Sequence, residues 1–282
     1  MRDEAILTRG AELIAQSSGI LIAAGAGMGV DSGLPDFRGA EGLWRAYPPL
    51  RQAGLRFEEI ANPEAFVDDP ALAWGFYGHR LQSYREVIPH RGFTILQEIA
   101  AHLPDGAFVF TSNVDGCFQK AGFAEERVCE VHGSIHHLQC FKPCSERIWP
   151  ADEFEPEVDM SACRLLSPLP RCPECGGLAR PNILMFGDWN WLEWRTSQQE
   201  ARLTAWRRAA TNPVVIELGA GKSVATVRML SERSGLPLIR INLRDPEVPS
   251  RSHIGVPMNA LAALEGIKEA LAGIGFGDGK FG

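Results

Sequence analysis

The sequence lacks a long hydrophobic run and an excess of basic residues. Its longest unbroken run of apolar residues and glycines, which begins at Gly19-Ile20-Leu21 and ends at Val30, is shorter than the about 20 residues that span a bilayer, so we expect no membrane partner. Lysine and arginine number 28 against 35 aspartates and glutamates, which gives a net charge of −7. This balance disfavours a protein built mainly to bind nucleic acid, and we expect no nucleic-acid partner.

The sequence also lacks the features of an exported, disulfide-linked protein. The first residues, Met1 to Glu4, include three charged side chains and lead into a helical pattern, so we expect no secretory signal. The seven cysteines are an odd number. A reducing compartment, with some cysteines on a metal, fits them better than a disulfide framework. We therefore expect a cytoplasmic protein.

The composition is that of a globular protein. Apolar residues make up 45% and charged residues 22% of the 282 residues, which excludes disordered, coiled-coil and collagen-like chains. Five short aliphatic runs are typical of buried parallel strands. They are Ile20–Ala24, Ala107–Thr111, Val128–Val131, Val214–Leu218 and Leu238–Asn242. Because helical patterns alternate with these runs, we expect an α/β fold with a doubly wound, Rossmann-like parallel sheet.

Two stretches interrupt the alternation of strands and helices. Residues 39–89 are rich in aromatics and read as helical, whereas residues 138–181 are rich in proline and cysteine. We expect both to be insertions that form a smaller lobe. The remaining segments, 1–38, 90–137 and 182–273, would form the large lobe, and 274–282 a flexible tail.

Two cysteine pairs stand in the second insertion. Cys140 and Cys144 form one pair, and Cys172 and Cys175 form the other. Thiolates at this spacing can make a tetrahedral zinc site, although free thiols in a loop are the alternative. Four thiolates leave no open coordination position, so the Zn²⁺ would be structural.

A glycine-rich turn follows the first predicted strand. Residues 25–27 read Gly-Ala-Gly, and residues 32–38 read Ser-Gly-Leu-Pro-Asp-Phe-Arg. Glycines at this place let the backbone approach a pyrophosphate, although a tight turn without ligand is the alternative. The longer string resembles the cofactor loop of the sirtuins, which are NAD-consuming protein deacylases. The resemblance implies that Arg38 meets phosphate and that Phe37 covers the nicotinamide ribose.

Further segments resemble sirtuin motifs in the same order along the chain, from about Gly19 to Leu271. These segments are Thr111–Asp115, His132–Ser134, Arg180–Asp188, Leu218–Gly221 and Asn242. The residues that the resemblance assigns to NAD are Gly25, Ala26, Gly27, Asp36, Phe37, Arg38, Ser112, Asn113, Asp115, Gly219, Ala220, Gly221 and Asn242. Met185, Phe186 and Gly187 match the segment that binds the acylated substrate.

Three polar residues are the candidates for catalysis. His132 closes a predicted strand at the edge where the glycine turn also ends, and a neutral imidazole there can take a proton from a ribose hydroxyl near pH 7. A satisfied structural histidine is the alternative. The resemblance implies that Asp115 receives the nicotinamide carboxamide and that Asn113 helps to orient ribose and water. Turn capping is the alternative for both.

The resemblance implies a protein lysine deacylase that consumes NAD and releases nicotinamide and O-acyl-ADP-ribose. Ser112 stands where the family usually has glutamine, which keeps a protein mono-ADP-ribosyltransferase open as an alternative. A non-catalytic sensor of NAD or ADP-ribose and an NAD-hydrolysing defence effector are further alternatives. The expected partners are acylated lysines of proteins.

Tyr77 and Arg80 suggest a preference among acyl groups. They lie three residues apart in a predicted helix, Ala71–Arg85, so they share a face. Tyr-x-x-Arg at this place resembles the sirtuin subclass that removes acidic acyl groups such as succinyl and malonyl. A solvated helix surface is the alternative.

Overall fold

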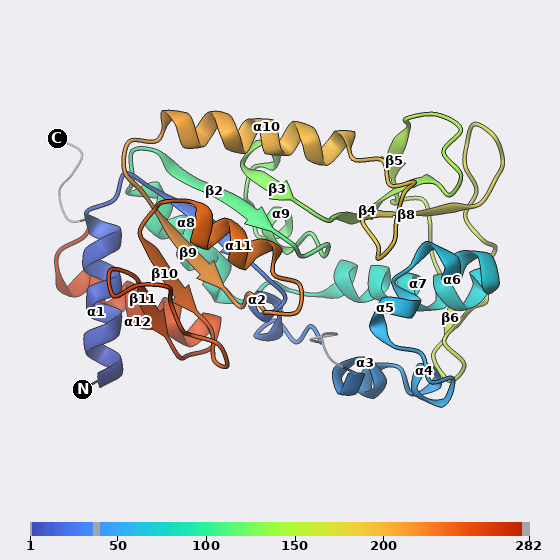
Figure 1. The fold of residues 1–282 in the computed structure, drawn as a ribbon, viewed down its shortest axis with the longest axis horizontal. Coiled ribbons are helices and arrows are strands. Elements are labelled where there is room, and N and C mark those ends of the chain that lie inside the picture. The colour runs from blue at the N-terminus through green and yellow to red at the C-terminus, as the bar shows by residue number, and fades with distance from the viewer. Residues whose placement is uncertain (1, 36–39, 278–282) are drawn as a thin grey trace.

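The computed structural model describes residues 2–35 and 40–277 (Figure 1). Its larger sheet has six parallel strands in the order β11-β10-β9-β1-β2-β3. The strands are β1 (Gly19–Ala24), β2 (Gly106–Thr111), β3 (Val128–Glu130), β9 (Pro213–Leu218), β10 (Leu238–Ile241) and β11 (Ile254–Val256). The predicted doubly wound parallel sheet is confirmed. Of the six strands in this sheet, only β11 was not predicted, because it is three residues long and has a glycine at its centre.

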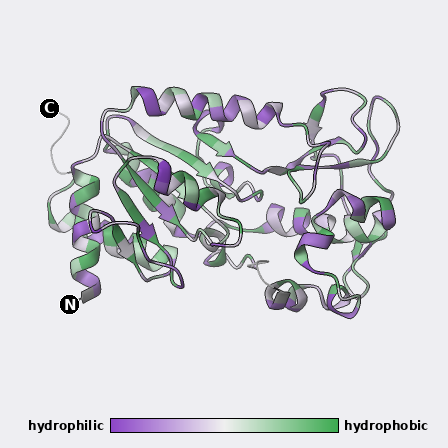
Figure 2. Ribbon diagram, viewed as in Figure 1, coloured by the Kyte–Doolittle hydropathy of each residue, from purple (hydrophilic) through white to green (hydrophobic). Residues whose placement is uncertain are grey.

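Helices cover both faces of this sheet. On one face pack α1 (Arg2–Ala15), α8 (Arg91–Ala101) and α12 (Ala260–Gly273), and on the other α10 (Trp194–Ala209) and α11 (Thr226–Arg233). Alternate residues of β1 serve the two faces, since Ile20 and Ile22 join the first core and Leu21 joins the second. In Figure 2 hydrophobic residues run along the strands, whereas α10 carries many hydrophilic residues on its outer side.

A second group of elements builds the smaller part of the molecule. Its helices are α3 (Ala40–Ala46), α4 (Pro48–Gln52), α5 (Phe57–Ile60), α6 (Pro63–Asp68) and α7 (Pro70–Glu86). Its strands are β4 (Gly133–Cys140), β5 (Ile148–Pro150) and β8 (Ala179–Ile183), which form an antiparallel sheet, with β6 (Val158–Asp159) and β7 (Arg164–Leu165) as a separate ribbon. The predicted limit between residues 137 and 138 falls inside β4, and the predicted lobe limits stay predictions.

One hydrophobic core joins the two inserted segments. Trp74 on α7 packs in the same cluster as Leu138 on β4, and its indole nitrogen donates a hydrogen bond to the carbonyl of Ala179, 3.0 Å away. Helix α7 touches the loop before β7 directly, because a Cβ at Gly75 would lie 2.1 Å from the carbonyl oxygen of Cys163. A side chain at residue 75 would therefore separate the helix from that loop.

Three short helical segments lie in the connections of the large sheet. They are α2 (Gly27–Val30), α9 (Cys117–Lys120) and the 3₁₀ turn η1 (Glu125–Arg127). Helix α2 follows β1 and α9 follows β2, so both begin at the carboxyl edge of the sheet, where ligands bind in folds of this type. Within residues 2–35 and 40–277, no helix is both long enough and apolar enough to cross a bilayer.

Candidate active site

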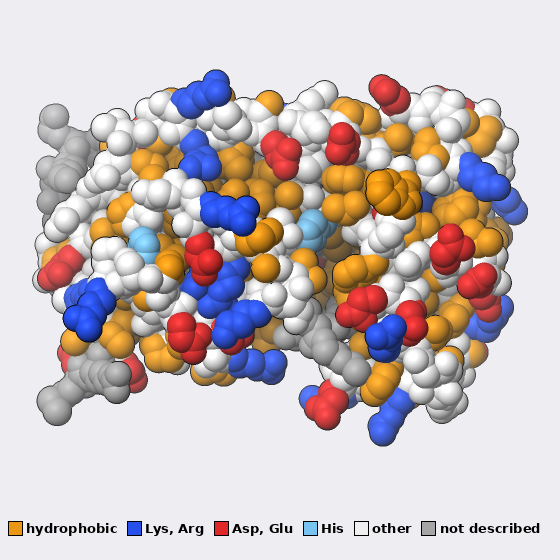
Figure 3. Space-filling view, viewed as in Figure 1, with side chains coloured by type: hydrophobic (Ala, Val, Ile, Leu, Met, Phe, Trp, Pro, Cys, Tyr) orange, Lys and Arg blue, Asp and Glu red, His pale blue; other side chains and the backbone are white. Residues whose placement is uncertain are grey.

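The candidate residues meet at the carboxyl edge of the large sheet, around two cavities. The first has a volume of about 260 Å³ and the second about 330 Å³. Ala26, in the turn after β1, lines both, so the cavities adjoin at that turn. Figure 3 shows a hollow on this side of the molecule, with hydrophobic and histidine side chains at its walls.

The first cavity brings together candidates from distant parts of the chain. The candidates that line it are Ala26, Tyr77, Arg80, Ser112, Asn113, Asp115, His132, Met185 and Phe186. The second cavity is lined by the candidates Ala26, Gly27, Gly219, Gly221 and Asn242. An extended ligand with two ends, such as a dinucleotide, fits this pair of adjoining cavities in shape.

The two glycine turns are in direct backbone contact. A Cβ at Gly27 would lie 2.6 Å from the Cα of Gly219, and a Cβ at Gly219 would lie 2.4 Å from the Cα of Gly27. Gly219 also has φ +60°, a conformation that favours glycine. Gly25 and Ala220 line neither cavity, because they pack against each other beneath these turns.

The side chain of Asn113 is held between β1 and β2. Its Nδ2 donates to the carbonyl of Gly25 at 3.1 Å, and its backbone nitrogen donates to the Thr111 hydroxyl at 3.0 Å. That hydroxyl in turn donates to the carbonyl of Ala24. The carboxamide of Asn113 is therefore fixed at the wall of the first cavity before any ligand arrives.

Asp115 combines a turn-capping contact with a place in the cavity wall. Its Oδ1 accepts a hydrogen bond from the backbone nitrogen of Cys117 at 2.9 Å, at the start of α9. The side chain is buried, and burial raises the pKa of its carboxyl. The ring of His136 lies behind it, with Nε2 2.9 Å from the carbonyl oxygen of Asp115.

His132 stands apart from the other two histidines of its segment. It lines the first cavity, whereas His136 and His137 line neither cavity. Its Nε2 lies 3.3 Å from the hydroxyl of Thr226 at the start of α11. Thr226 was not predicted, because it is 94 residues away in the chain and no local pattern marks it.

The loop after β8 is fixed from three sides. Leu184 donates from its backbone nitrogen to the carbonyl of His132 at 2.9 Å, and Phe186 donates to the carbonyl of Ala61 at 2.9 Å. A buried ion pair joins Arg180 in β8 to Asp188 in the loop. This anchoring presents Met185 and Phe186 to the first cavity. Gly187 lies outside the cavity lining and turns the chain with φ +66°.

Tyr77 and Arg80 lie on a buried face of α7. Arg80 is 7% exposed and Tyr77 is 1% exposed, so this face is not a solvated surface. Burial, the largest effect, raises the pKa of the Tyr77 phenol to about 12, and the phenol is therefore neutral at physiological pH. The guanidinium of Arg80 lies over the rings of Phe76, Tyr77 and Tyr84, 5.1 to 5.7 Å from their centroids.

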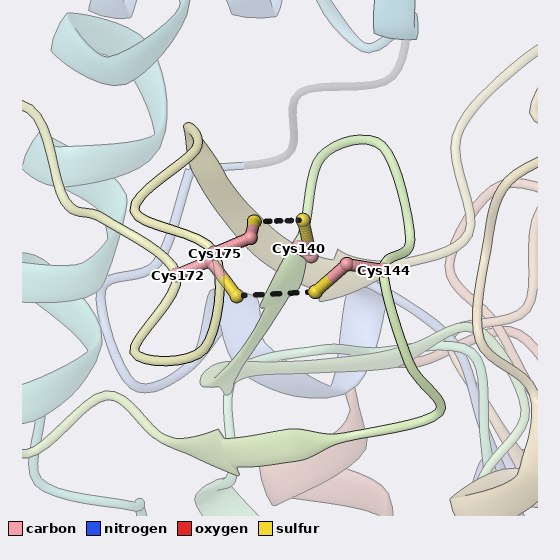
Figure 4. A group of neighbouring side chains, drawn as sticks. All are labelled: Cys140, Cys144, Cys172 and Cys175. Carbon is pink, nitrogen blue, oxygen red and sulfur yellow. Dashed lines mark hydrogen bonds between the residues drawn. The ribbon is translucent and has the colours of Figure 1, made fainter.

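The four predicted metal ligands form one cluster (Figure 4). The sulfurs of Cys140 and Cys175 are 3.7 Å apart, as are those of Cys144 and Cys172, and all four lie within 4.8 Å of one another. A tetrahedral site with Zn–S bonds of about 2.3 Å requires sulfur–sulfur distances of about 3.8 Å. The cluster fits Zn²⁺, and Cys163, which packs against α7, does not belong to it.

Three candidates, Asp36, Phe37 and Arg38, lie outside the described residues. The structure also adds residues that the sequence did not suggest. Tyr84 and Phe57 line the first cavity, and Lys222 and Arg244 line the second. Tyr84 had a usable signal, since it lies four residues after Arg80 on the same helix.

Comparisons with known proteins found similar sequences and similar structures. The model of the Sir2 family matches residues 25–220. An NAD-dependent protein deacylase of Pyrococcus furiosus is 34% identical over 235 residues, which cover 82% of this chain and 84% of the relative. NAD-dependent protein deacylase 2 of Pyrobaculum aerophilum is 34% identical over 236 residues, with 83% of each chain covered. The solved structure of a Sir2 homologue in complex with NAD matches with a TM-score of 0.69 and 25% identity, covering 94% of both chains.

Proposed function

The chain belongs to the Sir2 family, and on that premise we propose that it is an NAD-dependent protein lysine deacylase. One observation carries the proposal. Asn113, Asp115 and His132 follow two different strands of the sheet, yet they line one cavity that adjoins a second along the glycine turn. This arrangement supplies a place for a dinucleotide with a polar catalytic group at one end.

We assign NAD to both cavities. The adenosine half would lie in the second cavity, where Asn242 would meet its ribose and the backbone of Gly219 and Gly221 would let the phosphates approach closely. The nicotinamide half would lie in the first cavity beside Asn113 and Asp115. The carboxamide of Asn113 is already fixed by its hydrogen bond to the carbonyl of Gly25. It would therefore orient ribose and water there without a further loss of side-chain entropy.

In this proposal His132 is the general base. Its imidazole lines the first cavity and would take the proton of a ribose hydroxyl as that hydroxyl accepts the acyl group. Thr226 orients the ring through its contact with Nε2. The backbone link from His132 to Leu184 ties the base to the loop that presents Met185 and Phe186 to the acyl-lysine.

We assign the zinc ion a structural role. Four thiolates would fill its coordination sphere, and the cysteine cluster shares no residue with the lining of either cavity. The ion would hold together the two loops that carry the cysteine pairs. It would not take part in the chemistry.

We also propose a finer preference, for acyl groups that end in a carboxylate. Arg80 and Tyr77 supply a guanidinium and a neutral phenol at the cavity wall, and such donors suit a carboxylate. The cytoplasmic location stays a prediction.

Product analysis tests the proposed function. The protein would be incubated with NAD and a panel of acetyl-, succinyl- and malonyl-lysine peptides, and the products weighed by mass spectrometry. A deacylase gives free lysine, nicotinamide and O-acyl-ADP-ribose in equal amounts. ADP-ribose attached to protein would instead favour the mono-ADP-ribosyltransferase, which Ser112 in the cavity wall keeps as the second candidate. Binding of NAD without any product would favour a sensor.

A further inference from the structure

A third hollow lies apart from the two cavities of the active site. It is a surface groove of about 570 Å³ where the segment entering α10 meets the loop between β4 and β5. We call it the tryptophan groove. Its lining includes Glu146, Trp191, Glu193 and Trp194. It shares no residue with the other two cavities, so it requires an explanation of its own.

The lining of the tryptophan groove combines two indoles with two carboxylates. Trp194 is 39% exposed. Its Nε1 donates to the carbonyl of Glu146 at 2.6 Å, which fixes the indole against the loop between β4 and β5. The carboxylates of Glu146 and Glu193 are exposed and, among the described residues, have no ion-pair partner. Within the part of the chain that the structure describes, no lysine, arginine or histidine lines the groove.

The arginines next to these glutamates along the chain interact elsewhere. Arg147 lies 3.6 Å from Glu174, and Arg195 lies 2.7 Å from the buried carboxylate of Glu130. The groove therefore keeps its negative charge beside the two indoles. Indole faces attract cations more strongly than the other aromatic rings do, and nearby carboxylates add to that attraction.

We propose that the tryptophan groove binds a cationic side chain, arginine or lysine, of the acylated protein substrate. This inference rests on the proposed function. The negative charge of the groove is complementary to such a side chain, and one stretch of chain links the groove to the site of the acyl-lysine. An anionic or nucleic-acid ligand does not fit, because both charged groups of the lining are negative.

One stretch of chain connects the two sites. Phe186 lines the first cavity and Trp191 lines the tryptophan groove. Five residues span at most about 18 Å, so an extended substrate covers the distance with about five residues. Trp189, between them, is 96% exposed and has no hydrogen bond among the described residues. Its indole offers apolar surface along the path that the substrate would follow.

A peptide series tests the proposal. The parent peptide carries one acyl-lysine in a neutral sequence, and single arginines are placed at each position up to six residues on either side. We expect arginine at one or two neighbouring positions to lower KM roughly three- to tenfold, with kcat unchanged. Glutamate at the same positions should raise KM. The gain from arginine should shrink as salt is added.

Variants assign the effect to the groove. The double variant Glu146→Gln, Glu193→Gln keeps the shape of the groove and removes its charge, so it should lose the preference for arginine and keep its activity on the neutral parent. The matched control is Glu200→Gln, since Glu200 is exposed on α10 and outside the groove. A preference that survives in the double variant, or that is lost equally in the control, overturns the proposal.

A binding measurement separates this proposal from the proposed function. The arginine peptide is titrated without NAD and followed by tryptophan fluorescence, in wild type and in the double variant. Tighter binding to wild type supports the groove even if no peptide is deacylated. Deacylation without any arginine preference and without a binding difference overturns the groove and leaves the proposed function standing. A sedimentation shift from dimer to monomer on Trp194→Ala would assign the groove to a second copy of this chain, and would also overturn the proposal.

Discussion

Arg80 donates two hydrogen bonds to the hydroxyl of Tyr84, from Nε at 3.2 Å and from Nη2 at 2.9 Å. The two residues are one helical turn apart on α7, and both line the first cavity. The phenol therefore fixes the orientation of the guanidinium at the cavity wall. This contact bears directly on which acyl group the cavity accepts.

The first prediction concerns acyl selectivity. Arg80→Met should lower kcat/KM on succinyl- or malonyl-lysine about 10- to 150-fold, because a charge-assisted hydrogen bond contributes about 1.5–3 kcal/mol. Activity on acetyl-lysine should hold or rise. Tyr84→Phe, which only releases the guanidinium, should give a smaller loss in the same direction. Equal losses on acidic and acetyl substrates would show that Arg80 does not bind the acyl carboxylate.

The second prediction concerns the general base. His132→Ala should bind NAD as wild type does and lose deacylation roughly 10²- to 10⁴-fold, the range of general base catalysis. Thr226→Val, which removes the hydroxyl beside Nε2, should lose much less. NAD affinity by calorimetry and turnover by product analysis measure the two effects. Nearly unchanged turnover in His132→Ala would remove this residue from the mechanism.

The third prediction concerns the metal. Purified protein should contain about one equivalent of zinc, and Cys172→Ala should lose it and unfold or aggregate, because binding energy at a structural site is folding energy. Cys163→Ala is the matched control, since this cysteine lies outside the cluster, and it should keep its zinc. A metal-free preparation that stays folded and active would contradict the structural role.

The fourth prediction concerns the dependence of stability on pH. Burial, then the charges of Arg195 and His136, lowers the pKa of His137 from 6.5 to about 4. Between these two pH values, His137 therefore binds a proton in the unfolded chain and stays neutral in the folded chain. The free energy of unfolding should fall by up to about 1.4 kcal/mol per pH unit as the pH drops from about 6.5 to about 4, and this contribution should flatten below that range. Urea unfolding of His137→Gln should show a shallower decline, and an unchanged slope would contradict the assignment.

The fifth prediction concerns the wall of the second cavity. Arg228 on α11 donates from Nη2 to the carbonyls of Asp245 and Glu247, at 2.9 and 3.2 Å, and so positions the loop that lines this cavity. Arg228→Met should raise KM for NAD several-fold and leave kcat nearly unchanged. Arg233→Met, at an exposed position of the same helix, is the control. A change in kcat alone would contradict a positioning role in NAD binding.

The sequence by itself determined the features that depend on near neighbours in the chain. Buried parallel strands appear as short aliphatic runs, and five of the six were predicted for that reason. The spacings of Cys140 and Cys144, and of Cys172 and Cys175, already indicated two knuckles of one zinc site. The alternation of the aliphatic runs with helical patterns predicted the fold class, and the order of the family motifs predicted the chemistry.

Tertiary structure alone decided the relations between distant segments. The contact of His132 with Thr226 joins the end of β3 to α11 across 94 residues, and no local sequence pattern predicts it. The tryptophan groove arises where Glu146 meets a segment almost fifty residues further on. Burial of Arg80 was equally hidden, because the solvation of a helix face depends on what packs against it. Local patterns record backbone geometry and apolar periodicity, whereas packing between distant elements decides which side chains share a cavity.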